Sequence, residues 1–160
     1  MKLVKALILS LALASPLTAL ALGGDEQVEY TEALGNGNVA VVKKYLDSGV
    51  NVNDQYFAWS ALQIAANKNQ LAVVKLLVEK GADLNYKHPI TKMTALALAA
   101  VDGHKDVVAY LLSKGADPNI KLRGNVSIVR AVRDEGNTAM VDLLVKGGAH
   151  DDGCKDEKCF

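Results

Sequence analysis

Apolar residues recur at helical spacing in four segments of the chain, and a glycine follows each segment directly. The clearest segment is 73–85, which reads VVKLLVEKGADLN, and related copies lie at 107–119, 140–150 and, more weakly, 41–53. The aligned glycines are 32, 34 and 33 residues apart: Gly49, Gly81, Gly115 and Gly148. Because glycine readily adopts a left-handed backbone, the pattern predicts helices that each end in a left-handed cap.

A second, shorter apolar stretch precedes the later copies and predicts a partner helix. It reads SALQIAA at 60–66 and TALALAA at 94–100. Ser60 and Thr94 stand where a hydroxyl would accept a hydrogen bond from a free amide of the first turn. Turn-forming residues at 68–70, 102–104 and 135–137 separate the paired helices. Each unit is therefore helix, tight turn, helix and loop, and units must stack to bury their apolar faces.

The period near 33, the helix start TALALAA and endings such as GADLN resemble the ankyrin-repeat family. The resemblance implies an all-α solenoid within 22–150, with four helix-turn-helix repeats at about 26–53, 54–85, 86–119 and 120–150, joined by β-hairpin finger loops. The first repeat has lost its loop and the last is more charged, as expected of terminal caps. The sequence departs from the family at its usual proline and histidine, which puts that histidine's hydrogen bonds in doubt. The replacements are Ala61, Ala95 and Ile128 for proline, and Gln63, Ala97 and Arg130 for histidine.

In the resembled family, fingers and adjoining short helices line a concave face that binds another protein. Alignment carries the variable contact positions of that face onto three repeats of this chain. They are Tyr56, Phe57, Trp59, Asn67 and Lys68 in the second repeat, Ile90, Thr91, Met93, Val101 and Asp102 in the third, and Arg123, Gly124, Val126, Asp134 and Glu135 in the fourth.

The loop at 55–59, QYFAW, is the most informative of these segments. Aromatic residues make up only 5% of the chain, yet three gather in a loop that we expect to be exposed. Binding hot spots are enriched in large aromatic residues, and an exposed apolar patch typically marks an interface. In the alternative interpretation, Phe57 or Trp59 folds down over the helices as core cover. The neighbouring loop adds Ile90 and Met93, which suit adaptable apolar contact.

The N-terminal segment has the layout of a secretory signal peptide, at 1–21. Lys2 and Lys5 precede an almost wholly apolar stretch, and Ala19-Leu20-Ala21 offers a small-x-small cleavage site. An uncleaved membrane anchor is the alternative, although the run is short and broken for a bilayer span. The cleaved chain would carry 16 basic and 18 acidic residues. We expect it in the periplasm or outside the cell, and not in a membrane.

The chain has two cysteines, Cys154 and Cys159, in the tail at 151–160. In an exported chain, an even pair this close predicts a disulfide. Free thiols are the alternative. Four residues separate the pair, whereas a redox motif has two, and a metal site would need further ligands nearby.

Residues that could carry catalysis are scarce in this sequence. It contains no G-x-S-x-G, no H-E-x-x-H and no phosphate-binding glycine loop. His104 follows Gly103, as in the turn of the resembled family, and His150 replaces the aspartate of the repeat ending. Only His88 has no such explanation. It is expected to be either a solvated loop residue or a contact residue. Lys and Arg form no strong basic patch. We therefore expect no enzyme activity, no cofactor, no metal and no nucleic-acid partner.

The expected function is that of an exported protein-binding module, monomeric on its own. Family analogy and compartment favour a periplasmic inhibitor or self-protection (immunity) protein that blocks an exported enzyme, such as a peptidoglycan hydrolase or endopeptidase. Alternatives are an accessory protein that supports an exported enzyme such as a catalase, a secreted effector that binds a host protein, and a metal or small-molecule site around His88 and the tail.

Overall fold

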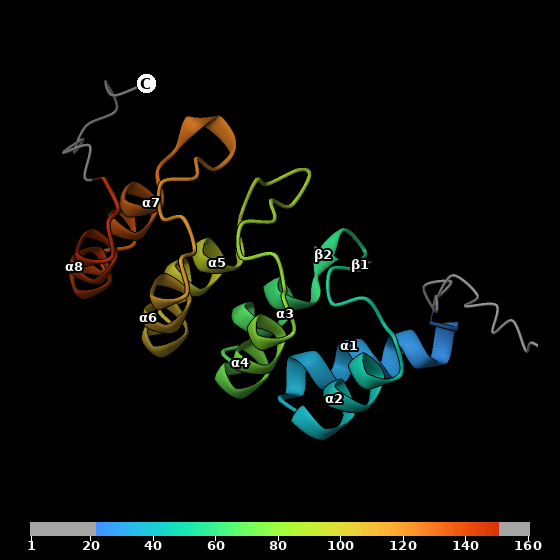
Figure 1. Cartoon of the computed structure of the whole chain (residues 1–160). Helices are drawn as coiled ribbons and strands as arrows, with labels where there is room; N and C mark the ends of the chain where they lie inside the picture. Colours follow the sequence, from blue (N-terminus) through green and yellow to red (C-terminus); the bar gives the residue numbers. More distant parts are fainter. Residues whose placement is uncertain (1–21, 151–160) are drawn as a thin grey trace, which may run out of the picture.

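The structure is a computed structural model that describes residues 22–150. Within this range, eight α-helices form four successive pairs that stack side by side from one end of the chain to the other (Figure 1). The inner helices adjoin the loops, and the outer helices form a second row. The inner helices are α1 (Gly24–Asn36), α3 (Ala61–Asn67), α5 (Ala95–Val101) and α7 (Ile128–Asp134), and the outer ones are α2 (Val39–Asp47), α4 (Leu71–Glu79), α6 (Lys105–Ser113) and α8 (Thr138–Lys146). The predicted all-α solenoid is confirmed.

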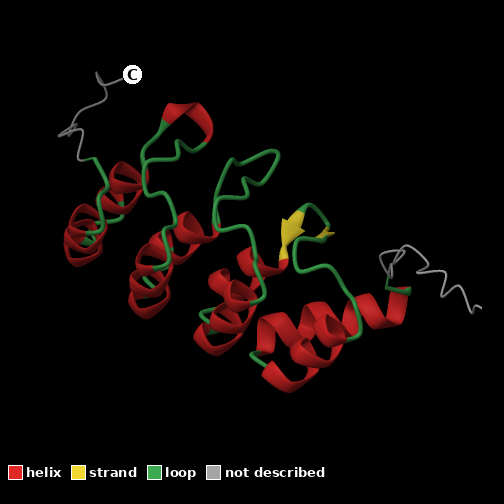
Figure 2. Ribbon diagram, in the orientation of Figure 1, coloured by secondary structure: helices red, strands yellow, loops and turns green. Residues whose placement is uncertain are grey.

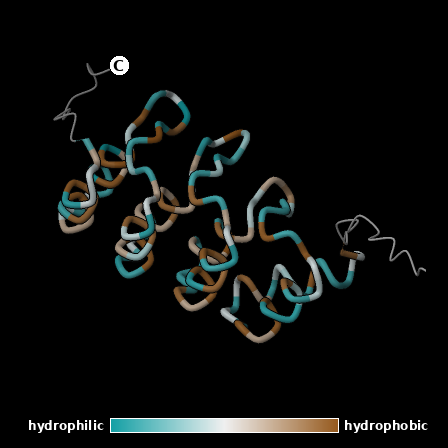
Figure 3. Tube along the Cα trace, in the orientation of Figure 1, coloured by the Kyte–Doolittle hydropathy of each residue, from teal (hydrophilic) through white to brown (hydrophobic). Residues whose placement is uncertain are grey.

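A single apolar core runs the length of the stack between the two rows of helices. Hydrophobic residues concentrate in the helices (Figure 3). In α5, every residue from Ala95 to Ala100 is buried, and the alanines allow α3 and α7 to pack closely on either side. Each outer helix buries one stripe, such as Val107, Val108 and Leu111 in α6. No unit encloses this core alone, so stacking creates it.

The predicted helix caps are present. The hydroxyls of Ser60, Thr94 and Ser127 each accept a hydrogen bond, at 3.2 Å, from the amide three residues later. Gly81 and Gly115 have φ values of +86° and +90°, the left-handed conformation in which an outer helix ends.

An asparagine at each repeat junction explains the recurring GADxN ending. Its side-chain oxygen accepts a hydrogen bond from a backbone amide of the next repeat. The three junctions are Asp83 to Asn53 at 2.8 Å, Asp117 to Asn85 at 2.9 Å and His150 to Asn119 at 2.8 Å. The same bond therefore joins every neighbouring pair of repeats in 22–150.

Gln63 supplies the hydrogen bonds that the missing histidine put in doubt. Its Oε1 accepts from the amide of Ser60 at 3.0 Å, and its Nε2 donates to the carbonyl of Met93 at 2.8 Å. A longer contact reaches the carbonyl of Tyr86 at 3.4 Å. Gln63 is 1% exposed. One buried side chain thus caps α3 and holds the loop of the following repeat.

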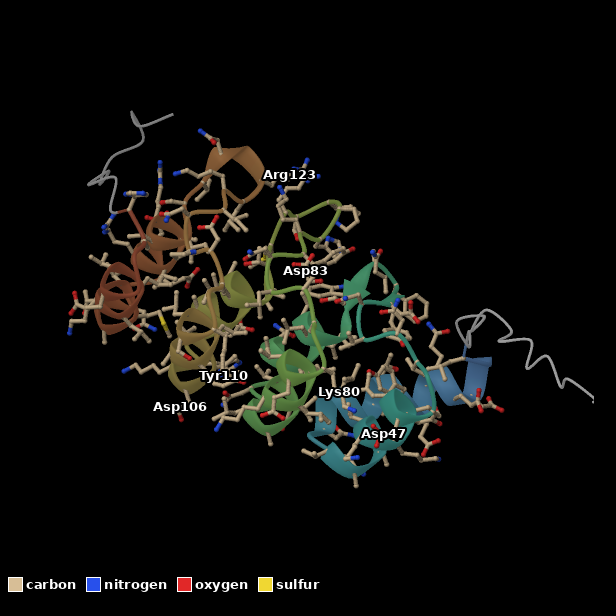
Figure 4. All side chains as sticks on the ribbon, in the orientation of Figure 1. Asp47, Lys80, Asp83, Asp106, Tyr110 and Arg123 are labelled. Atoms are coloured by element: carbon tan, nitrogen blue, oxygen red, sulfur yellow. The ribbon has the colours of Figure 1, made fainter. Side chains whose placement is uncertain are left out.

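An ion-pair cluster on the outer helices joins the first two repeats (Figure 4). Asp47 accepts a hydrogen bond from Lys43 in α2 and another from Lys80, whose Nζ lies 2.8 Å from Asp47 Oδ1. These hydrogen bonds, from Lys43 first and Lys80 second, lower the pKa of the Asp47 carboxyl from 3.8 to about 2. The cluster is exposed to solvent, which limits its contribution to stability.

Asp47→Asn is expected to make the protein's stability less sensitive to acid. A carboxyl with a depressed folded pKa contributes stability that is fully present above the unfolded pKa, here 3.8, and is lost as the pH falls through the folded pKa of about 2. Urea midpoints measured across this window should therefore fall more steeply for the wild type than for the variant. Asp106→Asn removes an exposed carboxylate of α6 that has no ion pair within 22–150, and should keep the wild-type slope. Equal slopes for Asp47→Asn and wild type would contradict the prediction.

Candidate protein-binding surface

Three loops project from the same side of the stack, next to the inner helices (Figures 1 and 2). We call them finger 2 (54–59), finger 3 (86–93) and finger 4 (120–126), after the repeats that they begin. Of the described residues, only finger 2 and Ser60 form strands, β1 (Gln55–Tyr56) and β2 (Trp59–Ser60). Finger 4 contains a 3-10 turn, η1 (Arg123–Asn125).

The turn of finger 2 holds Phe57 out into solvent. The two strands pair antiparallel, with Tyr56 opposite Trp59, and leave a two-residue turn at Phe57 and Ala58. Both turn residues have positive φ, +52° and +69°, as a tight hairpin turn requires. Phe57 and Ala58 adopt this conformation without being glycine or asparagine, at a cost in strain. The side chain of Phe57 is 88% exposed, as the sequence predicted for this loop.

The expected exposure of Tyr56 is wrong. Its side chain is only 5% exposed, and its ring packs 5.4 Å from that of Tyr30 on α1. Burial, and next the charge of Asp54, raise the pKa of the Tyr56 hydroxyl to about 12. Because Tyr56 and Trp59 are paired across the strands, they share the face of the hairpin that covers the repeats.

His88 is neither a solvated loop residue nor an exposed contact. It is 6% exposed, and its ring packs against that of Trp59 at 4.9 Å between centroids. Its Nδ1 accepts hydrogen bonds from the amides of Ile90 and Thr91, both at 3.3 Å. His88 therefore fixes the turn of finger 3 and fastens finger 2 to it.

Backbone hydrogen bonds give fingers 3 and 4 defined positions. The amide of His88 donates to the carbonyl of Met93 at 3.0 Å and closes finger 3, and that of Leu122 donates to Val126 at 2.9 Å and closes finger 4. The amide of Arg123 then donates to the carbonyl of Thr91 at 3.1 Å. Fingers 3 and 4 are thus joined directly, and Figure 4 shows Arg123 at this junction.

A predominantly apolar pocket of about 360 Å³ lies between finger 2 and the inner helices. It brings together five predicted contact residues and two that the sequence did not single out. The predicted ones are Tyr56, Phe57, Trp59, Asn67 and Lys68, and the additional ones are Thr31 and Ile64. A second hollow, of about 600 Å³, shares Thr31, Ile64 and Lys68 and extends along α1 to Glu32 and Gly35. The two hollows adjoin at these shared residues, and we call the region that they make up the α1–α3 groove.

The remaining predicted contact residues lie farther along the same face and differ in exposure. Ile90 is 66% exposed, whereas Thr91, Met93, Val101 and Val126 are half-buried. Asp102, Arg123, Gly124, Asp134 and Glu135 are exposed. Asp102 accepts a hydrogen bond from Asn67 Nδ2 at 2.6 Å, which links the ends of α3 and α5. The structure therefore gathers the second-repeat residues into one pocket and spreads the others along fingers and helix ends.

Thr31 and Ile64 could have been found from the repeat pattern. The first repeat lacks a finger, so the inner helix α1 is left uncovered beside finger 2, and Thr31 lies there. Ile64 occupies the same position in its repeat as Leu98 does in the next one. Leu98 is only 5% exposed, because the repeat before it has its finger and covers it. A missing loop therefore marks where a groove opens.

Within residues 22–150, no group of three or more His, Cys, Asp or Glu side chains is placed to hold a metal ion. No helix in that range is both long and apolar enough to cross a membrane. The predicted signal peptide at 1–21 and the predicted disulfide between Cys154 and Cys159 lie outside the described residues.

Comparison with known proteins identifies the repeats. A family model described as ankyrin repeats, in three copies, matches residues 31–121. The chain is 27% identical over 137 residues, 83% of its length, to the ankyrin repeat, SAM and basic leucine zipper domain-containing protein 1 of Dasypus novemcinctus, and 30% identical over 63 residues, 39% of its length, to that of Ovis aries. It is 32% identical over 110 residues, 69% of its length, to the ankyrin repeat and KH domain-containing protein mask-1 of Caenorhabditis elegans.

The matched regions make up 29%, 13% and 4% of those relatives, so the likeness concerns the repeats and not the whole proteins. Ankyrin repeats are protein-protein interaction modules and are typically not enzymes. The family match covers more than half of the chain and agrees with the helix pairs, caps and fingers described above. This chain therefore belongs to the ankyrin-repeat family.

Proposed function

We propose that this chain is an exported inhibitor or self-protection protein that binds and blocks an exported enzyme, such as a peptidoglycan hydrolase or endopeptidase. The observation that carries the proposal is Phe57, held 88% exposed at the tip of finger 2 beside the α1–α3 groove. An aromatic side chain in water is unfavourable, and burying it in a complex recovers the hydrophobic free energy. The layout of 1–21 supports the exported compartment.

The arrangement of Phe57 and the groove suits obstruction of a partner's surface. Phe57 can enter a cleft on a partner, while the adjacent pocket of about 360 Å³ can accept a side chain in return. Both parts are fixed before binding, because Trp59 packs on His88 and the asparagine junctions hold successive repeats. A surface organised in advance loses little conformational entropy on binding, which favours a tight and stoichiometric complex.

Phe57→Ala is expected to weaken the complex at least about tenfold, because an aromatic anchor typically contributes more than 1.4 kcal/mol. The test is a pulldown from periplasmic extract with residues 22–160, followed by an activity assay on the recovered enzyme. Val145→Ala is the matched control, since Val145 is also exposed but lies on α8. Wild type and control should inhibit the enzyme in a stoichiometric manner, and Phe57→Ala should require a much higher concentration.

The buried Tyr56 and the half-buried Trp59 are left intact in this test because their replacement would disturb the hairpin as well as the surface. An enzyme whose activity rises on binding would replace the inhibitor proposal with an accessory role. Equal binding by wild type and Phe57→Ala would place the interface away from finger 2. The absence of any exported enzyme partner would contradict the proposal.

A further inference from the structure

Fingers 3 and 4 carry an unbalanced positive charge that the sequence did not show as a basic patch, because its cations come from two separate loops. Lys87 and Lys92 lie on finger 3, and Lys121 and Arg123 lie on finger 4, all four exposed. Neither finger contains an acidic residue. Within 22–150, no carboxylate lies within ion-pair distance of these four cations. The bond from the Arg123 amide to Thr91 joins the two fingers, so the cations form one unit that we call the basic edge.

The opposite edge of the same face is acidic in the same two repeats. Asp102 caps the C-terminal end of α5, and Asp134 and Glu135 end α7. All three are exposed. Since α5 and α7 each have seven residues and begin at the fingers, about 10 Å of helix separates this acidic edge from the basic edge.

Helix stability accounts for Asp134, which pairs with Arg130 one turn earlier on α7, but it does not account for Asp102 or Glu135. The C-terminal end of a helix carries a partial negative charge, so it favours Lys or Arg and disfavours Asp and Glu. Asp102 is nevertheless held in place by the hydrogen bond from Asn67, and Asp134 lies 3.7 Å from Arg130 within α7. The four cations of the basic edge form no ion pair within 22–150, so they do not stabilise the fold in this way. The basic edge, together with Asp102 and Glu135 of the acidic edge, therefore points to a partner outside the chain.

We propose that the protein partner presents acidic side chains to the basic edge and basic side chains to the acidic edge, across repeats 3 and 4. This proposal rests on the proposed function in that the partner is a protein. It adds the partner's charge pattern and its orientation. Phe57 would anchor the partner at repeat 2, and the two charged edges would fix the partner's orientation across repeats 3 and 4. Opposite charges at two edges permit one orientation and penalise its reverse.

The test pans a displayed library of random dodecapeptides on residues 22–160 and compares the compositions of the selected peptides. The wild type should select peptides enriched in Asp and Glu. The charge-reversed variant Lys92→Glu/Arg123→Glu should lose this enrichment, and Asp102→Lys/Glu135→Lys should increase it. The matched control is Lys105→Glu/Lys146→Glu, which reverses exposed cations on the outer helices α6 and α8 and should select as the wild type does.

A peptide selected by the wild type should bind Lys92→Glu/Arg123→Glu about tenfold more weakly, as expected for two exposed charges. Circular dichroism checks that each variant keeps its helices. Selection without acidic enrichment, enrichment that survives reversal of the basic edge, or loss of enrichment in the control would each overturn the proposal. Panning does not depend on an enzyme, so an inhibited enzyme found without acidic selection would leave the proposed function standing while this inference fails.

Discussion

Leu96→Ala is expected to lower the free energy of unfolding by about 4 kcal/mol, near the upper part of the range for buried leucine. Leu96 is 0% exposed in α5, where α3 and α7 pack on both sides. The residues on the same side of α5 one turn later are alanines, Ala99 and Ala100, whose short side chains cannot move into the space that a lost isobutyl group leaves. The cavity therefore remains open, and the loss of contact adds to the loss of hydrophobic transfer.

Urea denaturation followed by circular dichroism measures this loss. Leu112→Ala is the control, because Leu112 is only partly buried on the outer helix α6 and its truncation should cost less than half as much. Since each repeat contacts only its neighbours, a break at α5 also separates the first two repeats from the last. Unfolding of the variant should for this reason become broader than that of the wild type. A loss below about 1 kcal/mol would show that α5 can collapse around the missing side chain.

Gln63→Ala is expected to cost about 3 kcal/mol, although it removes few apolar contacts. The variant leaves the buried amide of Ser60 without a partner and removes one of the two hydrogen bonds that the Met93 carbonyl accepts, the other being donated by the His88 amide. Each buried group that loses its hydrogen bond costs about 1–3 kcal/mol. Because Met93 ends finger 3, the loss should also loosen that finger and raise amide exchange at the His88–Met93 pair.

Gln63→His separates a hydrogen-bonding role from a packing role. The resembled family commonly has histidine at this position, and one ring nitrogen can accept while the other donates. Gln63→His should recover most of the stability that Gln63→Ala loses, whereas Gln63→Leu, similar in size but without polar atoms, should not. Thermal and urea unfolding measure all three. Recovery by leucine would assign the contribution of Gln63 to its volume.

The repeated parts of the fold could be predicted from sequence because their causes are local. A helix period, a hydroxyl before the first turn and a glycine after the last one fix each helix within its own segment, as at Thr94 and Gly115. The period near 33 then supplies the stacking, since similar units can bury their faces only against each other. The exposed Phe57 also followed from the sequence, because it stands at the turn of a short hairpin.

The side chains that were predicted wrongly depend on residues far away in the chain. Tyr56 lies in a two-residue strand, too short to show an alternating pattern, and its burial depends on Tyr30 in α1. His88 is held by Trp59, which belongs to the preceding repeat. The groove likewise requires α1 to lie uncovered beside finger 2. Such features follow from which repeats become neighbours, and the pattern within one repeat does not contain that information.

The asparagine junctions have a consequence for how such a chain changes in length. Asn53, Asn85 and Asn119 make the same bond to the following unit, so the joint does not depend on which two units meet. Duplication or loss of a whole repeat within the gene would therefore restore the asparagine hydrogen bond at the new junction in one step, without compensating substitutions there. The charged fingers would meanwhile be copied, deleted or shifted as complete blocks. The stack can in this way gain or lose binding elements by recombination while its helices keep the same partners.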